Sequence, residues 1–275
     1  MFSFLGIYVL GRDTAVSTGS IINALGRAGV SEEAVRSTLT RMPSRDLLQR
    51  HRRGRQMYFG LTPRSDAVLR DGQVRVWQVG AINRDWDGTW TVLGFSLPES
   101  WRRERHDLRS RLIWNGFGPL QNGMWISPSA VHMPALLHGL NLDSYVRVFT
   151  ARTAEPSRDA DLVRAAFDIP KIAAQYHSFL SRWADQGPSA DTPDNLARQL
   201  LLHADWLQVI RHDPRLPVCH LPGDWPAIRA ELVFRDMATS SDWLARPIAD
   251  ALLDTIAAGP IAATAQGHGD QAGGG

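Results

Sequence analysis

Arginine side chains that can bind phosphate groups are concentrated in one short stretch of the N-terminal third of the sequence. Two arginines and two hydroxyl residues recur there at helical spacing: Arg36, Ser37, Thr40 and Arg41. A second group follows in a basic segment and the strand after it: Arg52, Arg53, Arg55 and Tyr58. A guanidinium group pairs with phosphate oxygens and with guanine. These residue types predict contacts with double-stranded DNA. The first group would face bases and phosphates, and the arginines of the second group would clamp phosphates, with Tyr58 as a further contact.

A helix that begins after Ser31 is predicted to carry the first group. Ser31 suits an N-cap, and Glu32 and Glu33 place negative charge in the first turn, where the helix dipole favours it. An apolar face recurs opposite the arginines: Val35, Leu39 and Met42. Pro43 then breaks the pattern, and the leucines at 47–48 indicate that the helix resumes briefly.

The neighbouring elements suggest how this helix is held. A preceding helix, which Gly29 ends, is predicted from its apolar face: Ile21, Ile22, Leu25 and Ala28. The basic arm 50–55 and the alternating strand 57–61 predict a hairpin with Gly54 at its tip. Two helices joined by a short turn and followed by an arginine-rich hairpin form the layout of a winged helix-turn-helix. The second helix would enter a major groove, and the hairpin would lie along the phosphates.

Two other interpretations fit the same residues. A plain helical hairpin with a solvated basic face accounts for the helices, although a structural hairpin has no need of three neighbouring arginines: Arg52, Arg53 and Arg55. A protein-interaction module whose basic N-terminal domain docks an acidic partner accounts for the charge without DNA. A preference for one DNA sequence over competitor DNA distinguishes DNA reading from general charge attraction.

Charge is unevenly distributed over the 275 residues. Residues 1–77 hold 12 arginines and 6 acidic residues, a net charge of +6, whereas the remainder holds 18 basic and 22 acidic residues, a net charge of −4. An attraction to DNA therefore belongs to the N-terminal third. Hydrophobic residues make up 44% and charged residues 21%, which is the balance of a globular protein.

Composition also bears on the compartment. The single cysteine, Cys219, excludes an internal disulfide and favours a reducing interior. No apolar run approaches the roughly 20 residues that a membrane span needs. Residues 1–10 are apolar but lack a basic start and a cleavage site of small residues, so we interpret them as a core helix rather than a signal peptide. We expect a cytoplasmic protein with no membrane partner.

The pattern of the sequence changes three times, which predicts an α+β multidomain protein. Residues 1–77 form the predicted winged helix domain, 78–153 a ferredoxin-like middle domain, 154–258 a helical C-terminal domain, and 259–275 a Gly-rich disordered tail. The middle domain is predicted from the order strand, helix, strand, strand, helix, strand. These elements are expected at residues 90–95, 99–114, 116–120, 123–127, 129–140 and 145–149. A final helix is predicted from Asp242 or Trp243 to Ala258.

No set of residues indicates an enzyme. A metal-dependent nuclease would hold its cation on carboxylates at the end of the first middle-domain strand, but residues 95–98 contain no acid, and Asp85 and Asp87 suit a turn. Cys219 and His220 lack the paired spacing of zinc ligands, and a buried, inert thiol is expected at Cys219. We predict no catalytic residue, no metal site and no cofactor, with a metal-dependent nuclease kept as a remote alternative.

Several segments in a common order resemble the PaaX family, the bacterial repressors named for phenylacetic acid degradation. The resemblance extends over nearly the whole chain to about residue 255. Its segments are residues 29–42, 54–61, Trp86-Asp87-Gly88-Thr89-Trp90, Leu108-Arg109, Gly116-Phe117-Gly118, 212–217 and 221–226. The sequence departs from the family at residues 43–45, where a more regular helix is usual, and in its tail.

The resemblance implies a transcriptional regulator that acts as a homodimer and is released from DNA by a small-molecule effector. Its N-terminal domain would be a winged helix, its middle domain ferredoxin-like and similar to CRISPR adaptation nucleases, and its C-terminal domain helical. The effector of the best-known members is an aryl-acetyl-CoA thioester. Because this sequence departs from the family pattern, an acyl-CoA, an aromatic metabolite and a secondary metabolite stay open as effectors.

The effector site is expected between the middle domain and the C-terminal helices. The winged helix is too small and too basic to hold a pocket as well as DNA, and pockets concentrate where domains meet. Trp90, Arg109 and Trp225 are the predicted lining residues, because each lies in a segment that resembles the family. A core or structural role is the alternative for all three. A homodimer is also expected because one recognition helix reads only a few base pairs.

Overall fold

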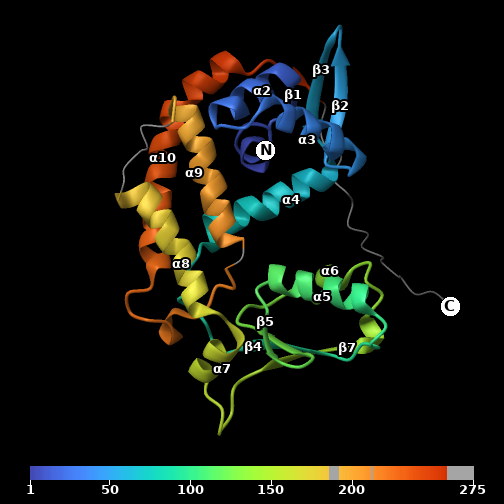
Figure 1. Cartoon of the computed structure of the whole chain (residues 1–275), viewed down its shortest axis with the longest axis vertical. Coiled ribbons are helices and arrows are strands. Elements are labelled where there is room, and N and C mark those ends of the chain that lie inside the picture. The colour runs from blue at the N-terminus through green and yellow to red at the C-terminus, as the bar shows by residue number, and fades with distance from the viewer. Residues whose placement is uncertain (186–191, 212, 259–275) are drawn as a thin grey trace, which may run out of the picture. The chain divides into compact units, whose positions relative to one another are not determined.

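The computed structural model describes residues 1–185, 192–211 and 213–258, and the predicted tail at 259–275 lies outside them. The chain divides into two compact units that are mixed α and β (Figure 1). The first comprises Met1–Val74 with the described parts of Ala190–Leu201 and Ser240–Gly275. The second comprises the described parts of Arg75–Ser189 and Leu202–Thr239. Each unit has one four-stranded antiparallel sheet.

The first unit contains the segment that carries the arginines. Its sheet has the order β2-β3-β1-β8, and the β2–β3 hairpin extends past the helices α2 and α3 (Figure 1). Its elements are α1 (Phe2–Tyr8), β1 (Thr14–Ser17), α2 (Thr18–Arg27), α3 (Glu32–Ser44), β2 (Leu48–Arg53), β3 (Gln56–Leu61), α4 (Pro63–Val74), the start of α9 (Asn195–Ile210), the end of α10 (Pro226–Leu252) and β8 (Thr255–Ala257).

Residues far apart in the sequence share the core of this unit. The apolar faces of α2 and α3 pack in one cluster with residues of α9 and α10: Leu196, Leu200, Ala245 and Ala249. Full burial of a leucine side chain stabilises the folded state by roughly 1.5–3 kcal/mol. The C-terminal half of the chain therefore supplies part of the core that supports α3.

The helix α3 departs from the prediction at its end. Ser31 caps it as predicted, accepting a hydrogen bond from the Ala34 amide at 3.3 Å. Pro43 does not break the helix, which continues to Ser44, and the predicted resumption at 47–48 is wrong because Leu48 begins β2. Proline lacks the amide hydrogen that would bond to the carbonyl four residues before it. In the last turn this loss affects a single bond, so the helix tolerates it.

The second unit is built around a sheet of order β5-β6-β4-β7. Its elements are η1 (Arg75–Val79), β4 (Trp90–Phe95), α5 (Arg102–Trp114), β5 (Gly118–Gln121), β6 (Met124–Ser127), α6 (Met133–Leu137), η2 (Asp143–Tyr145), β7 (Val146–Ala151), α7 (Asp159–Ala166), α8 (Ile169–Leu180), η3 (Ser181–Asp185), the rest of α9, η4 (Val218–His220) and the start of α10.

Apolar clusters cover both faces of the neighbouring strands β4 and β6 in this second sheet. On one face, the helices α5 and α6 (Figure 1) pack over Leu93 and Trp125. On the other face, Trp90 and Ile126 pack against Val163 of α7. Strands covered on both faces are rich in apolar residues, which is why Trp90–Phe95 was a clear prediction.

Two predicted helices are shorter than expected, and the last helix begins and ends earlier, at Pro226 and Leu252. α5 begins at Arg102 rather than residue 99, and α6 covers Met133–Leu137 rather than 129–140. Gly139 and Asn141 follow α6 with positive φ angles of 72° and 54°, which an α-helix does not accommodate. α10 ends at Leu252 rather than Ala258, because residues 255–257 pair with β1 as β8. No helix in the described residues has the length and apolar character needed to cross a membrane.

Candidate nucleic-acid interface

The outward face of α3 presents the polar residues predicted from the sequence. Val35, Leu39 and Met42 are buried in the core. The four predicted contact residues lie on the exposed side: Arg36, Ser37, Thr40 and Arg41. Helical periodicity thus separates the two sets as predicted.

Hydrogen bonds partly orient these exposed side chains. The Arg36 Nε donates to Glu32 Oε1 at 2.7 Å, yet 59% of the Arg36 side chain is exposed. The Thr40 hydroxyl donates to the Arg36 carbonyl at 2.9 Å. Within the described part of the chain, the side chains of Ser37 and Arg41 make no hydrogen bond. The face therefore offers two guanidinium groups and two hydroxyls to a ligand.

The β2–β3 hairpin carries the second group of arginines. Its register runs from Leu48 opposite Leu61 to Arg53 opposite Gln56, and Gly54 at the tip takes a φ of 60°. All four of its arginines are exposed: Arg50, Arg52, Arg53 and Arg55. Neighbouring side chains on a strand point to opposite faces, so Arg50 and Arg52 share one face.

A hollow of about 240 Å³ joins these two elements. It is lined by Thr18 of α2, by Arg36, Leu39 and Thr40 of α3, and by Arg50, Met57 and Phe59 of the hairpin. Arg36 and Arg50, although 14 positions apart in the sequence, thus border the same concave surface. Thr18 and Arg50 were not among the predicted contact residues. Strand alternation pointed to Arg50, because it places Arg50 on the same face as Arg52.

Tyr58 lies apart from the exposed arginines. Its side chain, predicted to contact DNA, is only 3% exposed, and its hydroxyl donates to Asp254 Oδ2 at 2.9 Å. Burial, and after it this hydrogen bond, raises the pKa of the Tyr58 phenol. The structure gives Tyr58 a role in connecting β3 to the segment after α10.

The three predicted effector residues lie in three separate environments of the second unit. Trp90 is 2% exposed and donates its indole hydrogen to Asp159 Oδ1 at 2.8 Å. Trp225 is buried with its ring 6.3 Å from that of Tyr176. Arg109 is exposed and borders a hollow of about 390 Å³ beside Trp125. None of the described hollows brings the three together.

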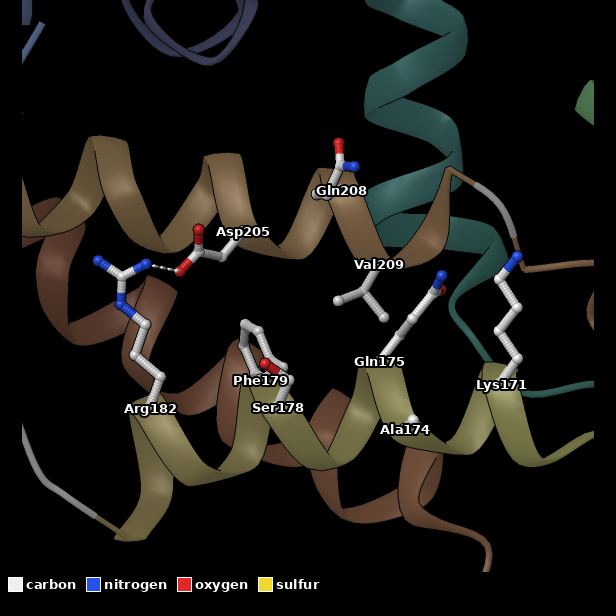
Figure 2. A pocket seen from close by; sticks show the side chains of 9 residues that line it. All are labelled: Lys171, Ala174, Gln175, Ser178, Phe179, Arg182, Asp205, Gln208 and Val209. Atoms are coloured by element: carbon white, nitrogen blue, oxygen red, sulfur yellow. Dashed lines mark hydrogen bonds and ion pairs between the residues drawn. The ribbon is translucent and has the colours of Figure 1, made fainter.

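A larger hollow of about 490 Å³ lies between α8 and α9 (Figure 2). Phe179 and Val209 give it an apolar side, and Lys171, the only lysine of the chain, stands at one end. At the other end Arg182 is paired with Asp205 at 2.8 Å (Figure 2). An apolar wall with a cation at each end suits a small molecule that carries a negative charge.

A partly buried charged group accompanies Tyr176 in the same unit. The Tyr176 hydroxyl donates to Asp213, and the Arg215 amide donates to Asp213 Oδ1 at 2.6 Å. Burial raises the pKa of the Asp213 carboxyl from 3.8 to about 6, against the opposing effect of these hydrogen bonds. The Arg215 side chain donates to the carbonyls of Gly80 and Ile82, at 3.1 and 3.4 Å. Asp213 therefore contacts Arg215, whose side chain in turn holds the backbone of residues 80–82.

The candidate metal ligands are not assembled in the described residues. No group of three or more His, Cys, Asp or Glu side chains there is arranged to hold a metal ion. Asp87 accepts a hydrogen bond from the Thr89 amide at 2.9 Å, which is the predicted turn role. The prediction of a buried Cys219 is wrong: this residue is exposed, because it follows two prolines in an extended turn that ends in the short helix η4.

Comparisons with known proteins agree on one family. Three family models match consecutive parts of the chain: the PaaX-like protein at residues 1–65, the PaaX protein central Cas2-like domain at 83–163, and the PaaX-like protein C-terminal domain at 167–251. The chain is 28% identical over 227 residues to the transcriptional repressor PaaX of Escherichia coli (strain K12). This match covers 78% of the chain and 70% of the E. coli protein.

A solved structure shares the fold. The Mycobacterium tuberculosis protein Rv0674 superposes with a TM-score of 0.60 at 24% identity, over 91% of this chain and 95% of that protein. The family models together span most of the residues from 1 to 251, in the order that the sequence segments had suggested. The chain therefore belongs to the PaaX family.

Proposed function

We propose that this protein is a transcriptional regulator that binds double-stranded promoter DNA through a winged helix-turn-helix made of α2, α3 and the β2–β3 hairpin. One observation carries the proposal: Arg36 and Thr40 of α3 border the same hollow as Arg50 of the hairpin. Two positively charged elements on one concave surface suit a duplex, whose phosphates flank the groove that a helix enters. The repressor activity named for the E. coli relative supports this role and favours repression.

The two elements would divide the work of binding. The exposed α3 residues would face base edges, and Arg36 and Arg41 can each bond to O6 and N7 of guanine. The hairpin arginines at 50, 52, 53 and 55 would neutralise phosphates without reading sequence. Arg50 and Arg52, on the face that borders the hollow, would lie nearest the duplex. A direct DNA contact by Tyr58 stays a prediction.

A mobility-shift titration on the DNA upstream of the protein's own gene tests the proposal. Arg52→Ala should weaken binding to all sequences alike and reduce the slope of log Kd against log salt by about one. Arg36→Ala should cost about 1–3 kcal/mol on the preferred sequence and less on competitor DNA, because it removes a base contact. Arg103→Ala is the matched control, since this α5 side chain is 90% exposed and lies in the other unit.

Two alternatives predict different results in the same titration. A module that docks an acidic protein would show no preference over competitor DNA. Equal binding by Arg52→Ala and the unchanged protein would also contradict our assignment of the hairpin. A metal-dependent nuclease would degrade the probe when Mg²⁺ is added. We expect no such degradation, because the relative is named as a repressor.

The finer features of the family resemblance belong to the same proposal. The strand order β5-β6-β4-β7 supports a ferredoxin-like middle domain. The strands β5 and β7, each of which follows a helix, lie at opposite edges of the sheet, and β4 and β6 lie between them. We propose boundaries at residues 77/78 and 153/154, a homodimer that doubles the recognition helix, and a location in the cytoplasm. Sedimentation that shows only a monomer, with and without DNA, would contradict the dimer.

Release by a small-molecule effector is the last element of the proposal, with a CoA thioester as one candidate. Trp90, Arg109 and Trp225 remain the sequence-based site, and the α8–α9 hollow beside Lys171 is a second location. Thermal-shift screening with CoA thioesters and free aryl acids would identify a ligand. Arg109→Ala and Lys171→Ala would then show which location holds it, because only the variant at the true site should lose the shift.

A further inference from the structure

The segment after α10 forms several hydrogen bonds with other residues of the unit that carries the arginines. We call residues 253–258 the C-terminal strap. Its strand β8 pairs antiparallel with β1, with Ala15 opposite Ile256. The amide of Ala258 donates to the carbonyl of Asp13 at 2.9 Å. The strap thus forms an edge of the sheet whose other edge is the arginine hairpin strand β2.

Asp254 is the residue through which the strap contacts the start of α2. Its carbonyl accepts from the Ser17 amide at 2.9 Å, and its amide donates to the Ser20 hydroxyl oxygen at 2.9 Å. The Ser20 hydroxyl also bonds to the Leu252 carbonyl at 3.0 Å. Ser17 is the N-cap of α2, accepting from the Ser20 amide at 3.2 Å. Asp254 therefore holds the residues that begin α2.

The same aspartate reaches the hairpin through its side chain. Tyr58 of β3 is buried, and its hydroxyl donates to the Asp254 carboxylate. Strand alternation places Tyr58 on the opposite face of the hairpin from Met57 and Phe59, which line the hollow. The hairpin is also connected to the start of α2 without Asp254: β1 pairs with β3, with Ser17 opposite Tyr58, and the Thr18 hydroxyl donates to the Met57 carbonyl at 2.9 Å.

These contacts point to a role that neither the sequence motifs nor the relatives assign. We propose that Asp254 is a positioning residue, which fixes the arginine hairpin relative to α2 and so keeps Arg50 next to the arginines of α3. The proposal rests on the proposed DNA-binding function for its consequence, but not for its structural part. A duplex binds tightly only when both elements are already in place, because ordering them on binding would reduce the affinity.

Two single variants and their combination test the proposal in the full-length protein. Asp254→Ala and Tyr58→Phe both remove the hydrogen bond between these two side chains, and Tyr58→Phe also removes the bond between the Tyr58 hydroxyl and Gln56 Oε1 at 2.7 Å. Thr255→Ala is the control on the same strap, since its exposed side chain makes no hydrogen bond within the described residues. Trypsin cleavage after the exposed hairpin arginines, followed by mass spectrometry, reports hairpin order without DNA. The dissociation constant for promoter DNA is the second measurement.

Asp254→Ala and Tyr58→Phe should each speed hairpin cleavage and weaken DNA binding about fivefold, the factor that one lost hydrogen bond produces. The double variant should be no worse than Tyr58→Phe, because that variant already removes the hydrogen bond that Asp254→Ala removes. Thr255→Ala should change neither measurement.

Other outcomes separate the possible errors. Cleavage and affinity that both stay at the level of the unchanged protein would overturn the proposal. Weaker DNA binding by Tyr58→Phe, with Asp254→Ala unchanged in both measurements, would overturn it in favour of a direct Tyr58 contact with DNA. If the unchanged protein binds no DNA while both variants speed cleavage, the DNA-binding function fails and the hold of Asp254 on the hairpin is supported.

Discussion

The two sheets of this protein have the same strand number and the same antiparallel pairing, yet they expose opposite chemistry. In the sheet of the second unit, apolar clusters cover both faces of the neighbouring strands β4 and β6, with Leu93 in one cluster and Trp90 in the other. The sheet of the first unit ends in a hairpin whose edge strand β2 exposes three arginines: Arg50, Arg52 and Arg53. Charged residues keep an exposed edge strand from pairing with other chains. They also leave it available to a charged ligand.

This contrast indicates which changes affect stability and which affect binding. Removing a side chain that is covered on all sides leaves a cavity, whereas removing an exposed arginine leaves the fold intact. Substitutions in the second sheet should therefore lower the free energy of unfolding, and substitutions in the hairpin should lower affinity for DNA. Three further experiments test this distinction.

The largest effect is expected for Trp90→Ala. The indole is 2% exposed and packs with Ile126 and Val163, so its loss should lower the free energy of unfolding by about 3–5 kcal/mol. Denaturant unfolding followed by circular dichroism measures this change. Under conditions where the variant stays folded, its DNA affinity should match that of the unchanged protein. A tenfold loss of affinity with unchanged stability would show that the two sheets do not divide these roles.

An intermediate effect is expected from pH acting on Asp213 in the second unit. The pKa of the Asp213 carboxyl is about 6 in the folded protein and near 3.8 in the unfolded chain, so the folded state binds the proton more tightly. The resulting stability is fully present below about pH 4 and is lost as the pH rises through 6, by roughly 1–3 kcal/mol. Urea unfolding at several pH values measures it. Asp213→Asn should remove this part of the pH dependence, and an unchanged profile would contradict the argument.

The smallest effect is expected at the exposed ion pair of α3. Glu32→Gln removes the partner of the Arg36 guanidinium and one negative charge near the proposed duplex. DNA affinity should rise about twofold, the size of such a surface pair, with little change in stability. Glu33→Gln is the matched control, because it removes the same charge in the same turn. Equal gains from both variants would show that net charge, and not release of Arg36, is responsible.

Local patterns were enough to predict α2, α3 and the hairpin. Each has a signal within a few residues: the apolar spacing of Ile21 and Leu25 for α2, that of Val35 and Leu39 for α3, and Gly54 between two strands for the hairpin. The exposed positions of the four α3 residues followed from the same periodicity. The site was therefore predictable where it depends on one helix and one hairpin.

The missed features depend on partners far away in the sequence. β8 has three residues, and its partner β1 lies about 240 positions earlier, so no local pattern reveals it. The burial of Tyr58 depends on that same distant segment through Asp254. Thr18 joins the hollow only because α2 packs beside the hairpin. These positions required the three-dimensional arrangement.

The core of the first unit combines residues from both ends of the sequence, and this affects when the unit can fold during synthesis. During synthesis the arginine segment leaves the ribosome early, but its core still lacks Leu196, Leu200, Ala245 and Ala249. The edge strand β8 follows only at residues 255–257. Because conformational entropy opposes folding until enough apolar surface is buried, the unit completes its fold only after residues 255–257 have been synthesised. A nascent chain that stops before residue 255 would then carry the arginine segment without a finished surface to present it, and would compete poorly with the longer chain for the proposed DNA target.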